Sequence, residues 1–182
     1  MVALTTPEAD KGWNAEEFIL LSVDGNYYDL AKVKGDNGLV VAFICNHCPY
    51  VKSIVDKIAR EANELRELGI GFVAINSNDS ISYPEDSYEN MKIFAKEHNF
   101  TFPYLLDNTQ EIAKKYDAVC TPDFFGFNSK LELQYRGRLD SAKKDIIPDA
   151  KRELFIAMSE VAKTSEFNGE QIPSIGCSLK WK

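Results

Sequence analysis

An apolar run in the first third of the chain constrains the fold most strongly. Residues 38–45 read GLVVAFIC, a continuous β-branched and apolar segment that is typical of a central strand covered on both faces. Apolar side chains then recur at helical spacing over residues 51–65, and this segment ends at Gly69. Residues 70–76, IGFVAIN, follow as a second buried strand. A strand, a helix and a strand at such short intervals predict a right-handed crossover with parallel strands.

The segments on either side of this unit predict a mixed sheet. EEFILLSVDGNYYDL reads as a hairpin around an Asp24-Gly25 turn, and FFGFN and LELQYRG read as two strands around an Asn128-Ser129 turn. Between them we expect a helix over residues 85–98, a strand FPYLLD and a short helix TQEIAKKYD, and after them a final helix over residues 147–163. This order predicts an α/β fold with helices on both faces of a mixed sheet and an antiparallel hairpin at its edge.

The 182 residues contain no internal repeat and no linker rich in proline, glycine or serine. We therefore expect one domain over residues 1–182, with a hairpin extension over residues 1–30, a helical insertion and a tail over residues 165–182.

Charge and apolar content exclude several functions. A net charge of −7 argues against nucleic acid or an anionic membrane as the main partner, because such partners require clustered lysine and arginine. The N-terminus lacks the pattern of a secretory signal, and the longest apolar run is too short to cross a bilayer. We therefore expect a cytoplasmic protein, in which the four cysteines are not permanent structural disulfides.

The stretch CNHCP carries the clearest chemical signal. Cys45 closes the predicted central strand, and Pro49 suits the first position of the helix that follows. Cys48 is then expected at the helix N-cap, where unpaired backbone N–H groups favour the reactive thiolate. A protonated His47 adds positive charge close by. A Cys-X-X-Cys at this point of a strand–helix–strand unit is typical of a dithiol that cycles with a disulfide.

Other interpretations of the cysteines remain open. The four cysteines could bind zinc, although their long separations differ from the paired spacing of zinc ribbons, and Cu(I) could bind two thiolates and His47. We expect no metal and no cofactor. Cys120 is either a small buried hydrophobe or a third redox group, and Cys177 is either an inert thiol or a resolving thiol.

Four segments, CNHCPYV, DAVCTPDFFGF, YRGRLD and PSIGCSLKW, occur in the same order as in a known family. Together they resemble the peroxiredoxin-like (AhpC/TSA-like) branch of the thioredoxin superfamily that carries Cys-X-X-Cys, and the resemblance runs through nearly the whole chain. It implies the thioredoxin fold and a thiol-dependent antioxidant or disulfide-reductase activity. It also implies a cis peptide bond at Thr121–Pro122, with the proline beside the dithiol.

The chain departs from that family pattern at several positions. Peroxiredoxins carry threonine three residues before the peroxidatic cysteine and an arginine from a later strand, whereas this chain has Cys45 and, roughly, Pro122 there. Ile44 replaces the tryptophan that precedes the dithiol in thioredoxin, and Asn46-His47 is closer to the Pro-His pair of the bacterial periplasmic disulfide oxidant. We expect a disulfide that is easier to reduce than that of thioredoxin, whose potential is roughly −270 mV.

The sequence therefore predicts a thiol–disulfide oxidoreductase in redox homeostasis or antioxidant defence, acting on a protein disulfide or a peroxide with an external thiol reductant. Cys45 is expected to attack in disulfide exchange and Cys48 in a peroxide step. The alternatives are a thiol peroxidase, a metal-binding protein and a non-catalytic scaffold; the oligomeric state is open. Arg136 and Arg138 are expected on the surface. Positioning or tuning of the thiols is expected from five residues: Asn46, His47, Pro49, Thr121 and Pro122.

Overall fold

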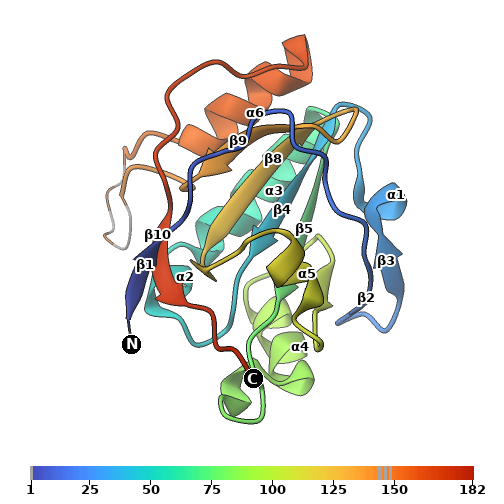
Figure 1. Ribbon diagram of the computed structural model, residues 1–182, viewed down its shortest axis with the longest axis vertical. Helices are drawn as coiled ribbons and strands as arrows, with labels where there is room; N and C mark the ends of the chain where they lie inside the picture. The colour runs from blue at the N-terminus through green and yellow to red at the C-terminus, as the bar shows by residue number, and fades with distance from the viewer. Residues whose placement is uncertain (1, 143–144, 146, 148) are drawn as a thin grey trace.

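The centre of the protein is a seven-stranded mixed sheet with the order β3–β2–β6–β5–β4–β8–β9 (Figure 1). The computed structural model describes residues 2–142, 145, 147 and 149–182. Strands β4, β5 and β6 run parallel, and the other neighbouring pairs are antiparallel, so the predicted mixed sheet with an antiparallel edge hairpin is confirmed. The strands are β2 (Ile19–Ser22), β3 (Tyr27–Asp29), β4 (Gly38–Phe43), β5 (Ile70–Asn76), β6 (Tyr104–Leu106), β8 (Asp123–Asn128) and β9 (Leu133–Gly137).

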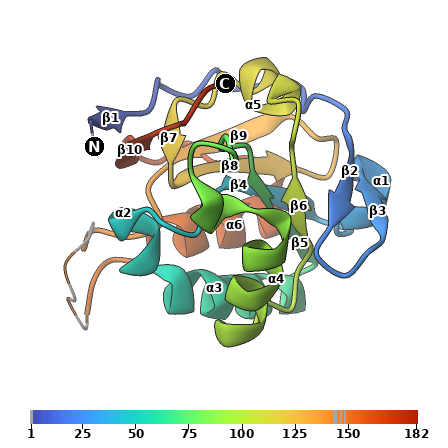
Figure 2. The same cartoon turned by 90° about the horizontal axis from the view of Figure 1, so that it is seen from below.

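Helices cover both faces of this sheet, as the sequence predicts. Figure 2 shows α3, α4 and α6 on one face and α5 on the other. None of the helices in the described residues is long and apolar enough to span a membrane. The helices are α1 (Leu30–Val33), α2 (Pro49–Lys52), α3 (Val55–Glu67), α4 (Tyr88–Glu97), α5 (Glu111–Lys115) and α6 (Glu153–Thr164), with a short 3-10 turn η1 (Pro84–Asp86) before α4.

Two helices begin later than the sequence predicts. Helix α4 begins after Ser87, whose hydroxyl accepts from the backbone N–H of Asn90, so residues 85 and 86 belong to η1. Helix α6 begins at Glu153, and described residues 147 and 149–152 are not helical; position 148 lies outside the described residues. Lys151 is held outside the helix because its backbone N–H and carbonyl both bond to Ser141.

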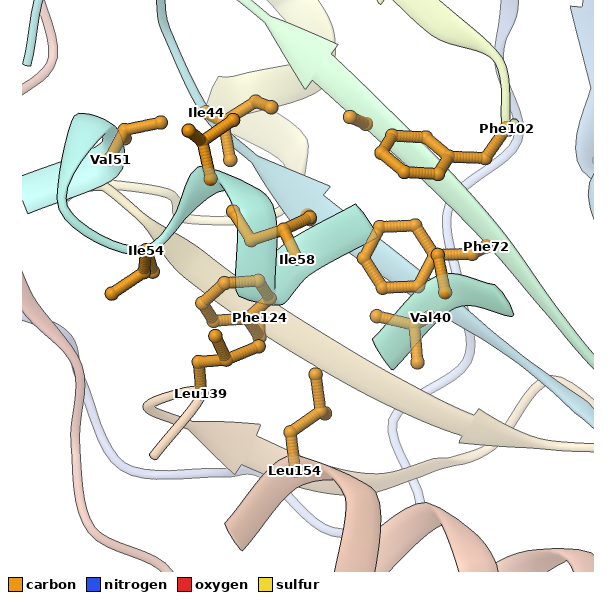
Figure 3. Close-up of a cluster of buried hydrophobic side chains, with 14 of the residues drawn as sticks. Val40, Ile44, Val51, Ile54, Ile58, Phe72, Phe102, Phe124, Leu139 and Leu154 are labelled. Carbon is orange, nitrogen blue, oxygen red and sulfur yellow. The ribbon is translucent and has the colours of Figure 1, made fainter. Parts of the chain in front are cut away.

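The alternating side chains of β4 contribute to two separate cores. Val40 and Ala42 face the core beneath α3 and α6, whereas Val41 and Phe43 face the core on the opposite side. Figure 3 shows Val40 in the first core, together with side chains from α3, β5 and β8. Burial on both faces explains why the strand reads as an unbroken apolar run.

A second, three-stranded sheet joins the two ends of the chain to the middle. Strand β10 (Ile175–Ser178) lies between β1 (Ala3–Thr5) and β7 (Cys120–Thr121), antiparallel to both. The close approach requires glycine at 176, since a Cβ there would lie 1.9 Å from the Thr121 carbonyl oxygen. The tail is therefore packed directly against the segment that precedes Pro122. The interpretation of the whole chain as one domain stays a prediction.

Candidate redox site

The two cysteines of the CNHC motif lie where the central strand passes into a helix. Cys45 follows β4, and Cys48 is the N-cap of α2 with Pro49 at the first helical position, as predicted. Both side chains are buried, with exposed fractions of 1% and 0%. Cys48 Sγ lies 2.7 Å from Cys177 Sγ on β10, and all four cysteines are free thiols.

The Thr121–Pro122 segment completes the surroundings of these sulfurs. The peptide bond is cis, which confirms the prediction. Cys45 Sγ lies 3.3 Å from Thr121 Oγ1, and Cys48 Sγ lies 3.3 Å from the Thr121 carbonyl oxygen. Burial raises the pKa of Cys120, the preceding residue, to about 12, so this cysteine remains a protonated thiol.

The pKa values of the three adjacent thiols are strongly different. A hydrogen bond from Cys45 and a second from Cys177 lower the pKa of Cys48 to about 5, although burial opposes this. Burial and the neighbouring Cys48 raise the pKa of Cys45 well above its usual value, and the same two causes raise that of Cys177 to about 12. The site therefore favours one thiolate, on Cys48, with a thiol donor on either side.

From the sequence, we expect the helix N-terminus and His47 to stabilise the Cys48 thiolate. In the structure, the hydrogen bond from Cys45 contributes most to the low pKa of Cys48, and the one from Cys177 also contributes more than the backbone N–H of Val51 in the four-residue helix α2. The predicted thiolate is thus supported, but its main cause is the thiol on each side.

Both middle residues of the motif are bonded to the turn η1. The backbone N–H of Asn46 donates to Asp86 Oδ1 at 2.7 Å, and its side-chain amide donates to the Glu85 carbonyl oxygen at 2.8 Å. His47 Nδ1 lies 2.6 Å from Asp86 Oδ2. Sequence reasoning missed Asp86; the available signal was its place in a polar loop after β5, since groups at the carboxyl ends of neighbouring parallel strands converge.

One cluster has the spacing that a metal ion would require. Ligand atoms of Cys45, His47 and Asp86 lie within 4.8 Å of one another, whereas the four-cysteine zinc set does not form such a group among the described residues. The Asp86 carboxylate already accepts from Asn46, His47 and the Asn78 amide, so its oxygens are engaged within the protein. These residues fit a hydrogen-bonded cluster, and we assign no metal to them.

The two arginines of β9 and its continuation are engaged away from the thiols. Arg136 is buried, and its guanidinium lies 2.9 Å from Asp123 Oδ2, so the expectation that it lies on the surface is wrong. Arg138, which is half-buried, forms a two-pronged ion pair with Glu153. Each guanidinium therefore finds its charge partner in a carboxylate.

A mixed sheet with helices on both faces, a strand-end dithiol and an adjacent cis-proline define a thioredoxin-fold protein with a thiol site. A family model described as the AhpC/TSA family matches residues 12–139, and the chain belongs to this family. A search of curated proteins found no match.

Solved structures share this fold. An uncharacterized conserved protein from Geobacillus kaustophilus is 46% identical, with a TM-score of 0.95 over 100% of this chain and 97% of its own. A hypothetical protein from Sinorhizobium meliloti 1021 is 37% identical, with a TM-score of 0.92 over 98% of each chain. Peroxidoxin BcpB from Mycobacterium tuberculosis shares the fold at 15% identity, with a TM-score of 0.62 over 86% of this chain and 98% of its own.

Proposed function

We propose that this AhpC/TSA-family protein is a thiol–disulfide oxidoreductase whose working group is the Cys45–Cys48 dithiol. The family indicates a thiol oxidoreductase or a thiol peroxidase. The observation that supports the dithiol most directly is that both sulfurs lie 3.3 Å from Thr121, beside the cis-proline, with Cys48 at the N-cap of α2. The lowered pKa of Cys48 and the raised pKa of Cys45 agree with this geometry. A role in cytoplasmic redox homeostasis, with a protein disulfide as substrate and an external thiol as reductant, is part of this proposal.

In the proposed cycle Cys48 attacks first. Its thiolate attacks one sulfur of a substrate disulfide, and the other substrate sulfur leaves as a thiolate and takes up a proton. Cys45 then loses its proton and attacks the Cys48 sulfur, which forms the Cys45–Cys48 disulfide and releases the second substrate thiol. The external thiol restores the pair. This order reverses the sequence-based preference for Cys45, because the reactive thiolate is favoured on Cys48.

The alternative activity, peroxide reduction, needs groups that polarise the peroxide as well as a thiolate. The arginines of β9 and its continuation are instead paired with carboxylates. We therefore expect the reduced protein to reduce a small disulfide such as oxidised glutathione, and to react with hydrogen peroxide no faster than free cysteine. Stopped-flow measurements of both reactions at pH 7 test this. Fast peroxide reduction with no disulfide reduction would assign the peroxidase instead.

A cavity lies between the tail and the cis-proline. Its volume is about 260 Å³, and Tyr50, Pro122 and Ile175 are among the residues that line it. Because Cys177 of β10 lies against the buried Cys48, we expect a protein disulfide to require displacement of this strand and a small disulfide to need less room.

Cys177 gives the site a third redox thiol in this proposal. In the Cys45–Cys48 disulfide form, Cys177 after loss of its proton attacks the Cys48 sulfur, and Cys45 leaves as a thiolate and takes up a proton; the exchange is redox-neutral. The 2.7 Å contact between Cys48 Sγ and Cys177 Sγ supports this step.

A Cys45→Ser variant isolates the third thiol. Treated with one equivalent of a dithiol-oxidising reagent such as diamide, it is expected to form a Cys48–Cys177 disulfide that peptide mass spectrometry identifies. Cys45→Ser with Cys120→Ser is the control and should give the same product. If Cys177 stays fully open to alkylation while Cys48 is oxidised, it has no redox role.

A further inference from the structure

A buried acid outside the CNHC motif is bonded to the histidine inside it. Asp86 is fully buried, and two of its partners, the Asn46 backbone N–H and the Asn78 side-chain amide, can only donate to it. Asp86 is therefore an ionised acceptor, and the proton in its 2.6 Å bond with His47 belongs to Nδ1 of the imidazole. In a neutral ring this leaves the lone pair on Nε2.

The other ring nitrogen of His47, Nε2, differs from Nδ1 in its surroundings. His47 Nε2 is buried and has no hydrogen-bond partner in the part of the chain that the structure describes. The ring is also fixed in place, because it stacks on Tyr83 with 5.2 Å between ring centroids and 10° between planes. A buried polar atom without a partner costs free energy, so its presence in a folded protein calls for an explanation, such as a catalytic role.

The His47 ring also lies close to one of the two reacting sulfurs. A ring nitrogen of His47 lies within 4.8 Å of Cys45 Sγ, a distance that a proton crosses through one water. Cys45 is the thiol that must lose a proton in the second step of the proposed cycle, and its burial makes direct transfer to solvent slow. The proton acceptor must therefore come from within the site.

We propose that His47 is the catalytic proton shuttle of the dithiol and that Asp86 is the positioning residue that holds it for this task. The proposal rests on the proposed disulfide chemistry and adds two residues to it.

The reduced site holds the two protons that the two leaving thiolates take up. The starting state holds a Cys48 thiolate, a Cys45 thiol and a His47 imidazolium. When Cys48 attacks the substrate disulfide, His47 gives its proton to the first leaving thiolate. Neutral His47 then takes the Cys45 proton, Cys45 attacks the Cys48 sulfur, and the second leaving thiolate receives that proton. Two thiols become one disulfide, one substrate disulfide becomes two thiols, and both protons come from the site.

The charges around the ring favour this starting state. The hydrogen bond to Asp86 raises the pKa of His47, burial opposes it, and Cys48 and Glu85 raise it further. Burial raises the pKa of Asp86, but hydrogen bonds from His47, Asn78 and Asn46 lower it below its usual value. The groups around the ring are Cys45, Cys48, Tyr83, Glu85 and Asp86. The Lys180 ammonium lies 5.6 Å from the centroid of the Tyr83 ring on which His47 stacks.

The first test is the pH dependence of disulfide reduction. Activity requires the Cys48 thiolate and the His47 imidazolium, so the rate should fall below the Cys48 pKa and again above the His47 pKa. Asp86→Asn removes the charge that raises the His47 pKa, so the alkaline limb should move to lower pH and the rate at pH 7 should fall about 10-fold or more. His47→Gln should remove that limb and lower the rate about 100-fold. Glu89→Gln removes an exposed acid of α4 that pairs with Lys92, away from the His47 ring, and should stay close to the wild-type protein.

The second readout does not depend on activity. The chain has two histidines, so the NMR titration of His47 is assigned with a His98→Gln reference. We expect its pKa to fall in Asp86→Asn and to change little in Glu89→Gln. An unchanged His47 pKa, or a rate lowered by the same factor at every pH, would overturn the shuttle and leave the dithiol proposal in place. A wild-type protein that reduces no disulfide would overturn both.

Discussion

A variant with Cys45→Ser and Cys177→Ser is expected to trap a disulfide substrate covalently on Cys48. The Cys48 thiolate still attacks, but no neighbouring sulfur remains to release the mixed disulfide. The matched variant Cys48→Ser should trap nothing, and its turnover should fall by roughly 10³-fold or more, as when a nucleophile is removed from other enzymes. Incubation with a labelled small disulfide, followed by intact-protein mass spectrometry, measures both results.

Cys120→Ser is the control for this experiment, because Cys120 is a buried thiol whose pKa lies far above neutral. It should behave as the wild-type protein does. Efficient trapping on Cys45 in the Cys48→Ser variant would instead restore Cys45 as the first nucleophile and refute the order of steps given above.

Asp123→Ala is expected to lower the free energy of unfolding by about 3–5 kcal/mol, the usual cost of removing one partner from a buried ion pair. Asp123 directly follows the cis-proline, is fully buried and pairs with Arg136, which is itself buried. The substitution leaves the guanidinium of Arg136 without a charge partner inside the protein. Urea unfolding curves of the two proteins measure the difference.

An exposed ion pair provides the comparison. Glu89 and Lys92 form a pair on the surface of α4, so Glu89→Ala should change stability by less than about 1 kcal/mol. An equal loss of unfolding free energy in both variants would show that burial does not determine how much the Asp123–Arg136 pair contributes to stability.

The elements that depend on local pattern could be predicted from the sequence. Strands β4 and β5 were identified because burial on both faces leaves an unbroken apolar run, and the hairpin β2–β3 because Asp24-Gly25 is a strong turn signal. Strands β1 and β10 were missed because they are short and form only when residues 3–5 meet residues 175–177, a pairing with no local signature. The late start of α6 was missed for the same reason, since Ser141 determines it from outside the helix.

The candidate site likewise has features that short motifs predict and contacts that depend on how distant segments meet. The Cys45–Cys48 spacing, the Pro49 position and the cis bond at Pro122 follow from short motifs. The contact between Cys177 and Cys48 depends on how the tail returns across β7, and the Asp86–His47 bond depends on how η1 folds over the motif loop. For the same reason, the sequence does not reveal the main cause of the lowered Cys48 pKa, which is the pair of thiols on Cys45 and Cys177.

Equilibration of the protein in glutathione or dithiothreitol buffers of known potential, with alkylation and peptide mapping, tests the dithiol most directly. A single two-electron transition that joins Cys45 to Cys48 is predicted, at a potential less negative than roughly −270 mV because the Cys48 thiolate stabilises the reduced form. Thiols at both positions that stay free to alkylate across the whole range of potentials would contradict the account.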